Sequence, residues 1–528
     1  MKESIVELTA EEIDALIQRI ETGTLTDNDL SAIKAIVKSY LKLTRALRQK
    51  TISVKKLMRM IFGASTEKAK TVLGKIASTA KALLSDTNDR KGCSKKHRGH
   101  GRNGVSAYSG AEKISVPHPA MKSADVCPEC AKGKVYPSVE PGVFVRITGG
   151  APLKSQVWEM QKLRCNLCGE IYAAPLPEEA GTEKYDETAG AIIPLLKYGS
   201  GLPFNRLEQL QESMGSPLPA STQWEITERT ADRGPSAVYK ELLRQGAHGH
   251  TIYNDDTIMK ILSMINDNKE DDRSGIFTTG ILSIVGDNKI VLFCTGRNHA
   301  GENITNLLAQ RDPTMPPPIQ MCDALSRNVP KEFETILANC LAHGRRNFVD
   351  VTESFPEECR YVIEALSEVY KNDKMAKEQN MTPSMRLKHH QENSGPGMKQ
   401  LHDWMTEQME NRKAEPNSGI GKAISYMLKH WEPLTLFLRV EGAPLDNNIC
   451  EQALKRAILH RKNSLFYKTL HGAQVGDIFM SLIHTCKLAK INPFHYLVEL
   501  QRHMQDVIKR PQDWLPWNYI ETLAAMPV

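Results

Sequence analysis

The sequence lacks the features of a membrane-spanning or secreted protein. A spanning helix needs about 18 to 20 consecutive apolar residues, and no such run occurs among the 528 residues. The N-terminal stretch MKESIVELTAEEIDALIQRI is acidic and patterned as a helix, without the apolar core of a signal peptide. We therefore expect a cytoplasmic protein with no membrane partner.

The chain also lacks the cysteine pattern of a disulfide framework. The chain has eleven cysteines, an odd number, of which four form two Cys-x-x-Cys pairs while the others are scattered. Such a pattern suits a reducing compartment and a metal site better than a set of disulfides.

The length and composition indicate a globular protein of several folded units. The chain is 41% hydrophobic and 25% charged, and it is too long for one ordinary domain. The hydrophobic periodicity and the Pro/Gly breaks predict a multidomain α/β chain. Its expected segments are an N-terminal helical domain at 1–86, a basic linker at 87–120, a zinc ribbon at 121–180, a helical, helix-turn-helix-like segment at 185–245, the first part of an α/β core at 246–350, a helical insertion at 351–440, a second core part at 441–495 and a helical tail at 496–528.

The N-terminal segment has two interpretations. Residues 9–49 read as two helices, and Thr26 and Asp27 stand where an N-cap is expected, ahead of LSAIKAIVKSYLKLTRAL. A small helical bundle or a pair of dimerising helices fits this pattern, and so does a DNA-binding helix-turn-helix.

A strongly basic stretch follows at residues 90–102, where no acid occurs. It is either a solvated linker or an electrostatic arm that binds DNA phosphates. Its six cations are Arg90, Lys91, Lys95, Lys96, Arg98 and Arg102.

The two Cys-x-x-Cys pairs predict a structural zinc site. Cys127 with Cys130, and Cys165 with Cys168, have the spacing at which both thiolates of a pair reach one metal ion from a hairpin knuckle. Two knuckles complete a tetrahedron and leave no open position, so this Zn²⁺ would be structural. The alternative is a chance clustering of buried cysteines, which the paired spacing disfavours.

Three acids have the positions that a two-metal nucleotidyl-transfer site requires. Asp255 lies at the end of a strand-like run, in Asn-Asp-Asp-Thr, Asp323 ends the strand-like IQMCDA, and Glu451 lies on the helix that opens with Asp446-Asn447-Asn448. Grouped carboxylates bind two hard cations that stabilise both oxygens of an in-line displacement at phosphorus. Spacing alone is a weak signal in a chain with 62 acids. Asp446 also fits a helix N-cap, and Asp256 would replace Asp255 if the strand register differed by one.

At these residues the sequence resembles the transposases of the insertion-sequence 66 family, over most of its length. The resemblance covers NDDT at Asp255, MCDA at Asp323, CLAHGRRNF, and LDNNICEQALKRAILHRKNSLF at Glu451. It extends to LMRMIFGASTEKA, GHGRNG, the predicted ribbon, LPFNRLEQLQ and DWLPWN. Three departures are visible: residues 1–50 show no long leucine-rich coiled coil, Asp256 replaces the usual glutamate, and Leu341 replaces the common tryptophan.

The resemblance implies a ribonuclease-H-like catalytic core in which Asp255, Asp323 and Glu451 bind two Mg²⁺ or Mn²⁺ ions. It implies cleavage at transposon ends and strand transfer, with double-stranded DNA (terminal inverted repeats and target) as partner, a homo-oligomer on DNA, accessory proteins of the same element, and association with the nucleoid. His343, Arg345 and Arg346 are expected either to support the active site and contact phosphate or to form a buried polar network. Lys455, Arg456, Arg461 and Lys462 are expected to bind DNA beside Glu451.

Two other functions remain open at this point. One is a non-catalytic or domesticated zinc-ribbon DNA-binding protein, against which the presence of all three acids argues. The other is a related nuclease that hydrolyses nucleic acid without strand transfer.

Overall fold

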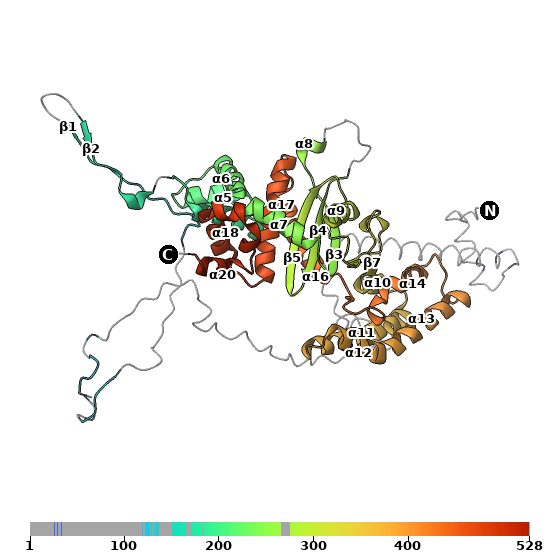
Figure 1. Ribbon diagram of the computed structural model, residues 1–528. Coiled ribbons are helices and arrows are strands. Elements are labelled where there is room, and N and C mark those ends of the chain that lie inside the picture. The colour runs from blue at the N-terminus through green and yellow to red at the C-terminus, as the bar shows by residue number, and fades with distance from the viewer. Residues whose placement is uncertain are drawn as a thin grey trace.

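The computed structural model describes residues 150–164, 171–181, 183–265 and 275–526, with single residues and short stretches between 19 and 136. The described residues form a mixed α/β structure with a five-stranded sheet and many helices, consistent with a multidomain α/β chain (Figure 1). Most of the predicted N-terminal domain, the basic stretch 90–102, and Cys127, Cys165 and Cys168 lie outside the described residues.

The central sheet has the strand order β5-β4-β3-β6-β7. β4 is antiparallel to both β3 and β5, whereas β3, β6 and β7 are parallel to one another. The strands are β3 (Thr251–Ile258), β4 (Phe277–Val285), β5 (Asn288–Gly296), β6 (Ile319–Cys322) and β7 (Ile336–Asn339).

The β-branched and apolar runs of the sequence predicted four of these strands, and the structure confirms them. β3 continues past Asp255 to Ile258, so the prediction that the strand ends at Asp255 was wrong. Its pairing with β4 over all eight residues keeps it extended. β7 was not predicted. It has four residues, and Cys340 alone separates it from the helix α10 (Leu341–Val349), so no turn residues mark its end.

Helices from both ends of the described chain pack together beside the sheet (Figure 1). α18 lies against α4, and α17 lies against both α6 and α7. The N-terminal set is α4 (Glu187–Pro194), the π-helical turn η3 (Leu195–Gly199), α5 (Phe204–Ser213), α6 (Ala220–Asp232) and α7 (Pro235–Gly246); the C-terminal set is α17 (Leu470–Leu488), α18 (Pro493–Arg502), α19 (Met504–Lys509) and α20 (Tyr519–Ala524).

Several of these helices begin where the sequence supplies a capping side chain. Asp186 accepts a hydrogen bond from the Ala189 N–H at the start of α4, at 2.9 Å. Thr469 does the same for the Gly472 N–H at the start of α17, at 3.0 Å. Such caps satisfy amide groups that have no partner inside the helix.

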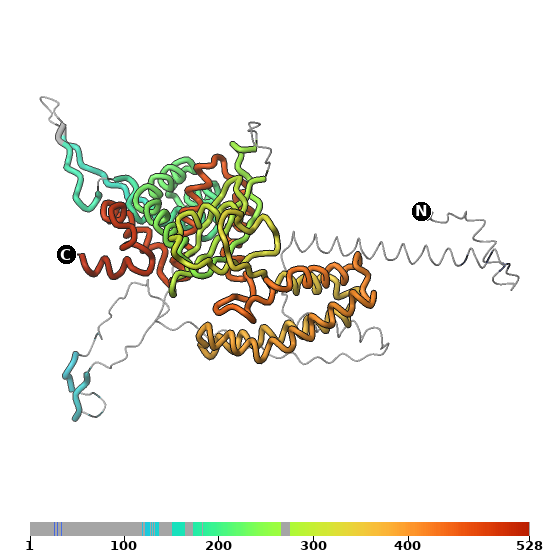
Figure 2. Tube along the Cα trace, turned by 45° about the vertical axis from the view of Figure 1, so that its right-hand side comes forward, coloured from blue at the N-terminus to red at the C-terminus, as the bar shows by residue number. Residues whose placement is uncertain are grey.

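A helical region follows the last strand and lies to one side of the sheet (Figures 1 and 2). Its elements are α11 (Pro356–Glu378), α12 (Pro383–Asn393), α13 (Gly395–Glu410), α14 (Gly419–Lys429), α15 (Trp431–Leu434) and η5 (Leu436–Leu438). The break predicted at residues 394–397 is the junction of α12 and α13, and the break at 415–419 separates α13 from α14.

A buried ionic cluster ties this region together. Asp373 of α11 is 4% exposed and accepts hydrogen bonds from Arg386 of α12 at 2.7 and 2.9 Å. His390 and Lys377 lie 3.4 and 2.6 Å from the same carboxylate. Arg386 also donates to the Ala443 carbonyl at 2.8 Å, which links the cluster to the loop that precedes α16 (Asn448–Ser464).

Helix α17 covers the edge strand β5 with a row of three polar side chains. Asp477, Ser481 and Thr485 lie four residues apart on the helix and are all buried. They accept hydrogen bonds from the backbone N–H groups of Thr295 at 2.7 Å, Phe293 at 2.9 Å and Val291 at 3.0 Å. The row therefore satisfies edge amides that would otherwise be open to another strand.

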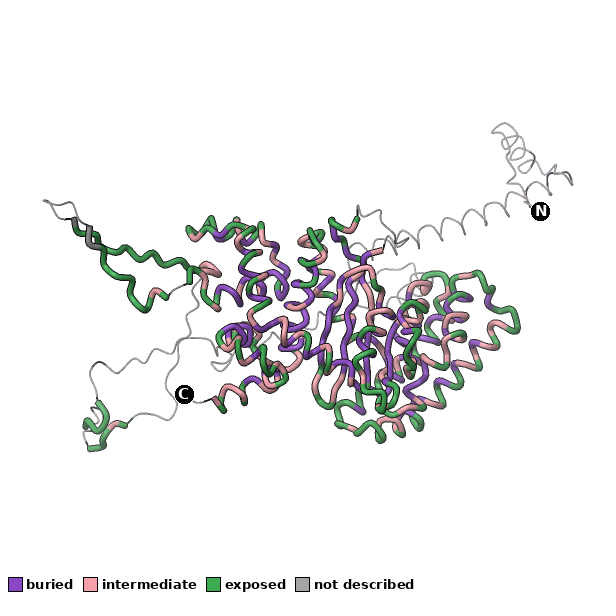
Figure 3. The backbone as a smooth tube through the Cα atoms, turned by 45° about the horizontal axis from the view of Figure 1, so that its top comes forward, coloured by how far each residue is buried: buried purple, intermediate pink, exposed green. Residues whose placement is uncertain are grey.

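The burial pattern follows this architecture (Figure 3). Strands of the sheet and the inward faces of α16 and α17 are buried. The helices at the periphery have one buried and one exposed face. Among the described residues, no helix is both long enough and apolar enough to cross a membrane.

Short elements complete the described chain. A two-stranded hairpin is formed by β1 (Lys162–Arg164) and β2 (Ile171–Ala173), which pair antiparallel. The remaining elements are η2 (Glu178–Ala180), α8 (Leu262–Ile265), α9 (Ala300–Leu308), η4 (Ser326–Asn328) and η6 (Pro511–Trp514).

Candidate active site

The three predicted acids lie on three elements that meet at one end of the sheet. Asp255 is in β3, Asp323 directly follows β6, and Glu451 is in the first turn of α16. β3 and β6 are parallel neighbours, with Tyr253 opposite Met321, so both strands point their carboxyl ends the same way. α16 packs on β3 and β4, which brings its first turn to the same place.

The strand register directs Asp255 towards α16. Asp255 pairs with Gly280 of β4, and a Cβ added at Gly280 would lie 3.2 Å from the Leu454 side chain of α16. Cross-strand partners point to the same face of a sheet. The Asp255 carboxylate and the Glu451 helix therefore share one face.

Asp256 points to the opposite face, as successive strand residues do. Its carboxylate accepts hydrogen bonds from the Thr279 hydroxyl at 2.6 Å and from the Ala300 N–H, at the start of α9, at 2.9 Å. Asp256 thus joins β3 to the first turn of α9, which leaves Asp255 as the acid on the α16 face.

His343 of α10 lies between the other two acids. Its Nδ1 is 2.8 Å from Asp323 Oδ1, and its Nε2 is 3.8 Å from Glu451 Oε1. Burial lowers the pKa of His343, but Asp323 and Cys340 together outweigh burial and raise this pKa to about 10. His343 therefore belongs to the acid cluster, although it also forms part of a half-buried polar network.

The negative charges of the same cluster repel the Asp255 carboxylate. Burial, followed by the negative charge of Asp323, raises the pKa of Asp255 to about 7, while a hydrogen bond from the Asp256 N–H opposes the shift. Glu451 adds to the repulsion. A raised carboxylate pKa from burial and neighbouring like charge is typical of functional sites.

Buried amide and thiol groups orient the elements that carry the acids. The Asn447 side chain, fully buried, donates to the Asn254 carbonyl of β3 at 3.0 Å. The Asn447 N–H lies 3.3 Å from the Cys340 Sγ, to which it donates, and the Leu341 N–H donates to the Leu445 carbonyl at 3.0 Å. These contacts join the start of α16 to β3 and to the start of α10.

A group of metal-ligand side chains includes a residue that sequence analysis passed over. In the described part of the chain, one set of three His, Cys, Asp or Glu side chains brings its ligand atoms within 4.8 Å of one another: Asp323, Cys340 and His343. Cys340 is fully buried. The spacing Cys340-x-x-His343, which puts both side chains on the first turn of one helix, was the available signal.

The predicted basic residues near the site differ in their contacts. Arg346 Nη2 is 4.0 Å from Glu451 Oε2, and Arg345 is half-buried beside it. Arg456 donates to the Gly199 carbonyl at 3.2 Å, and Arg461 donates to the Thr257 hydroxyl at 2.9 Å. Lys455 and Lys462 are exposed.

Of the predicted zinc ligands, the structure describes Cys130. The Gly133 N–H lies 3.4 Å from the Cys130 Sγ, within a hairpin closed by the bridge between Val126 and Lys134. The second Cys-x-x-Cys pair falls between β1 and β2 in sequence. The two hairpins lie apart in both views that are coloured by residue number (Figures 1 and 2).

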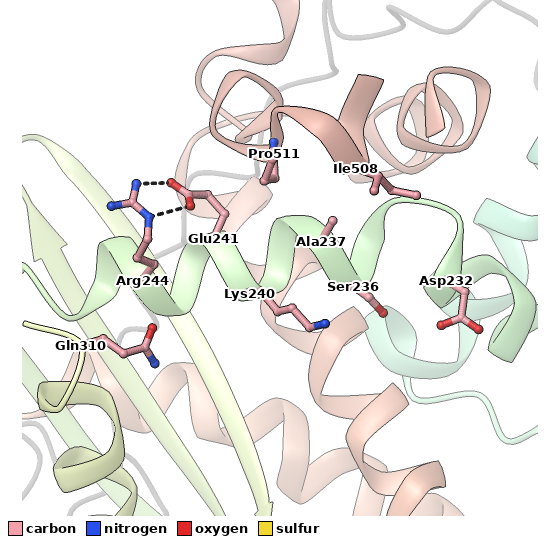
Figure 4. A pocket seen from close by; sticks show the side chains of 9 residues that line it. All are labelled: Asp232, Ser236, Ala237, Lys240, Glu241, Arg244, Gln310, Ile508 and Pro511. Carbon is pink, nitrogen blue, oxygen red and sulfur yellow. Dashed lines mark hydrogen bonds and ion pairs between the residues drawn. The ribbon is translucent and has the colours of Figure 1, made fainter. Parts of the chain in front are cut away.

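A hollow of about 540 Å³ lies elsewhere, along α7 (Figure 4). None of the predicted catalytic residues lines it. Two of its charged side chains pair with each other, since Arg244 donates to both carboxylate oxygens of Glu241 at 2.6 and 2.8 Å. The hollow therefore offers no grouping of reactive side chains comparable to the acid cluster.

Comparison with known proteins gives partial matches to three relatives from Sinorhizobium fredii. The uncharacterized protein y4jD is 32% identical over 187 residues, which is 35% of this chain and 36% of that protein. The uncharacterized protein y4hP is 29% identical over 214 residues, 38% of each chain, and y4qI is 28% identical over 196 residues, 35% of this chain and 34% of that protein. The chain thus spans about a third of the length of the curated relatives it matches.

The sequence model of the transposase IS66 family matches residues 184–475. That span is more than half of the chain and contains the whole sheet, α10 and α16, with the three acids and His343. The chain therefore belongs to the IS66 family of transposases, as the resemblance of its motifs predicted.

Proposed function

We propose that this protein is a DNA transposase that cleaves phosphodiester bonds at the ends of its element and joins the freed 3′-hydroxyl to target DNA. The observation that carries the proposal is the meeting of Asp255, Asp323 and Glu451 around His343. Glu451 Oε1 is buried and has no hydrogen-bond partner among the described residues, and the buried Asp323 Oδ1 has His343 Nδ1 beside it as an ion-pair partner, 2.8 Å away. Buried polar atoms are normally hydrogen-bonded, so a buried oxygen without such a partner points to a ligand.

We further propose that the sheet is a ribonuclease-H-like core. The support is its five strands in the order β5-β4-β3-β6-β7, in which β4 runs opposite to the rest. The acids lie on the central strand, directly after its parallel neighbour and on a helix packed against the sheet, as that core requires. In this interpretation α11–α15 are an insertion between the last strand and the helix that carries Glu451.

The side chains fit Mg²⁺ or Mn²⁺, since these hard cations prefer carboxylate oxygens. Asp255, Asp323 and Glu451 would hold the ions, and positive charge there would offset the repulsion that raises the pKa of Asp255. When bound, two such ions stabilise the attacking and leaving oxygens of an in-line displacement at phosphorus.

The neighbouring residues orient the acids and hold DNA. His343, protonated, places a positive charge between Asp323 and Glu451. Arg345 and Arg346 lie on the same helix and would contact phosphate. Lys455 and Lys462 would bind the DNA backbone along α16. Arg456 and Arg461 would bind it too, and they also connect α16 to η3 and β3 by hydrogen bonds.

The DNA partners proposed are the element's terminal inverted repeats and the target duplex. We propose that the basic residues at 90–102 bind phosphate and that the chain acts as a homo-oligomer with accessory proteins of its element, as the resemblance implies.

The two Cys-x-x-Cys pairs would bind one structural Zn²⁺, which would draw the two hairpins together. Metal binding then contributes directly to folding. We expect about one tightly bound zinc per chain, measured by mass spectrometry of the metal, and its loss in Cys130→Ser. Stoichiometric zinc in a Cys127/Cys130 double variant would contradict this assignment.

The test of the catalytic proposal is Glu451→Gln, which keeps the side-chain shape but removes its charge. Asp255→Asn and Asp323→Asn complete the set. We expect each variant to bind the element's ends with unchanged affinity, yet to lose end cleavage and strand transfer by at least about a hundredfold in Mg²⁺ or Mn²⁺. Combined variants should lose no more than single ones, because the acids act as a unit.

Asp256→Asn is the matched control, because Asp256 is adjacent in the same strand but points towards α9. It should keep cleavage and lose a little thermal stability. Normal cleavage by all three acid variants would refute the catalytic proposal and favour a non-catalytic DNA-binding protein. Cleavage without joining of pre-cut ends would instead identify a nuclease.

A further inference from the structure

Asp323, Cys340 and His343 gather oxygen, sulfur and nitrogen ligand atoms at one point. Asp323 follows β6, while Cys340 and His343 lie one turn apart at the start of α10. Their ligand atoms lie within 4.8 Å of one another, and Nδ1 of His343 is 2.8 Å from Oδ1 of Asp323. Three ligand atoms at this separation can bind one metal ion, with a fourth position left for water or substrate.

Two of the ligand atoms, Asp323 Oδ1 and His343 Nδ1, form an ion pair with each other. Both atoms are buried, and neither has a further hydrogen-bond partner in the described part of the chain. The Cys340 Sγ accepts a hydrogen bond from the Asn447 N–H at 3.3 Å, which holds the sulfur atom beside the other two ligand atoms.

The surroundings match those of a metal-bound histidine. If Nδ1 of His343 binds the ion, Nε2 points towards Glu451 Oε1, 3.8 Å away. Metal-binding histidines usually turn their second nitrogen towards a carboxylate, carbonyl or water. The side chains of Asp323 and His343 are 19% and 22% exposed, so an ion can enter past them although Cys340 is fully buried.

The donor set selects a different metal from the one that the acids select. Zn²⁺ and other thiophilic ions prefer thiolate and imidazole, whereas Mg²⁺ prefers oxygen and binds sulfur poorly. Asp323 belongs to both sets. An ion held by Asp323, Cys340 and His343 therefore withdraws Asp323 from Asp255 and Glu451.

We propose that Asp323, Cys340 and His343 form a Zn²⁺ site that overlaps the proposed Mg²⁺ site, and that Zn²⁺ bound there switches off DNA cleavage. The binding half of this proposal stands on the three side chains alone. The inhibitory half rests on the proposed transposase activity.

The binding half is tested with Co²⁺, a Zn²⁺ substitute whose bonds to thiolate absorb light. Co²⁺ is titrated into the full-length metal-free chain, into Cys340→Ser and into Cys322→Ser, which removes a neighbouring buried thiol outside the cluster. Absorption from the two Cys-x-x-Cys pairs is common to all three proteins and cancels in the difference spectra. We expect a cobalt–thiolate band that Cys340→Ser loses and Cys322→Ser keeps.

His343→Gln provides a second variant that leaves Cys340 in place, and it should weaken Co²⁺ binding at this site by about tenfold or more. Far-UV circular dichroism shows which variants are folded. Identical Co²⁺ spectra for the wild type and a folded Cys340→Ser would overturn the proposal, as would a folded His343→Gln with unchanged affinity.

The inhibitory half is tested by adding Zn²⁺ to cleavage assays at constant Mg²⁺, with each protein normalised to its own zinc-free rate. We expect the half-inhibitory Zn²⁺ concentration to rise about tenfold or more in Cys340→Ser. Co²⁺ binding together with equal inhibition of both proteins would refute the overlap with the Mg²⁺ site. Absence of any cleavage in Mg²⁺ alone would count against the proposed transposase activity, and the Co²⁺ spectra would still decide the metal site.

Discussion

Two neighbouring helices, α16 and α17, each direct a carboxylate at the sheet, and the two carboxylates have opposite surroundings. Asp477 of α17 is 3% exposed, and the Thr295 N–H and hydroxyl donate to it, both at 2.7 Å. Glu451 of α16 is also largely buried, but its Oε1 has no hydrogen-bond partner among the described residues.

The difference separates structural acids from functional ones. A buried acid whose oxygens accept hydrogen bonds from the fold stabilises the fold through those hydrogen bonds, although burial disfavours its charge. A group of buried carboxylates that repel one another costs stability unless a ligand supplies positive charge, and such costs are typical of functional sites. The comparison therefore predicts a loss of stability when the hydrogen-bonded Asp477 is removed and a gain when the charge of Asp255 is removed.

The largest effect is expected from Asp477→Ala. The substitution leaves the buried Thr295 N–H without an acceptor and opens a cavity beside β5. We expect a loss of about 3 kcal/mol in the free energy of unfolding, measured with urea. A loss below about 0.5 kcal/mol would mean that the α17 row is not needed to cover the edge strand.

Asp477→Asn isolates the charge and gives a pH dependence. Burial raises the pKa of Asp477 to about 7 from an ordinary value of 3.8. The folded state then binds more protons than the unfolded state between about pH 4 and pH 7, so this group's contribution to stability falls as the pH rises through that window. We expect the free energy of unfolding of the wild type minus that of Asp477→Asn to decrease between pH 4 and pH 7 and to stay constant above pH 7. A difference that increases with pH would contradict a raised pKa.

A smaller loss of stability is expected from Thr485→Val, which keeps the side-chain shape but removes the acceptor of the Val291 N–H. We expect about 1–2 kcal/mol of destabilisation, since a buried edge amide is left unsatisfied. Thr305→Val is the matched control, because the Thr305 hydroxyl donates to the Gly301 carbonyl of its own helix, at 3.0 Å. Equal losses for the two variants would show that the contact with β5 contributes nothing specific.

The smallest effect, in the opposite direction, is expected from Asp255→Asn in the presence of EDTA. Removing one charge from the acid cluster relieves the repulsion from Asp323 and Glu451. We expect a gain of about 1 kcal/mol in the free energy of unfolding, as in other cases where stability opposes function. A clear loss of stability would place Asp255 with Asp477 among the structural acids.

Local patterns in the sequence were sufficient for many of the elements. Runs such as IFTTGILSIV and KIVLFC alternate or are apolar throughout, and they form β4 and β5 with the two-residue turn that Gly286 and Asp287 suggest. The helices around RLEQLQES and STQWEITERTAD are also present, as α5 and α6. β3 extended beyond its predicted end because pairing with β4, a contact distant in sequence, continues there.

The sequence by itself determined the family, through short motifs distributed over residues 184–475, and it named the three acids as candidates. The tertiary structure decided which face of β3 each aspartate occupies, since side-chain direction depends on the pairing of β3 with β4 and on the packing of α16 and α9. It also decided that Cys340 joins Asp323 and His343, because the parallel pairing of β6 with β7 brings the start of α10 beside the end of β6. Contacts of this kind join segments far apart in the chain, and local periodicity carries no information about them.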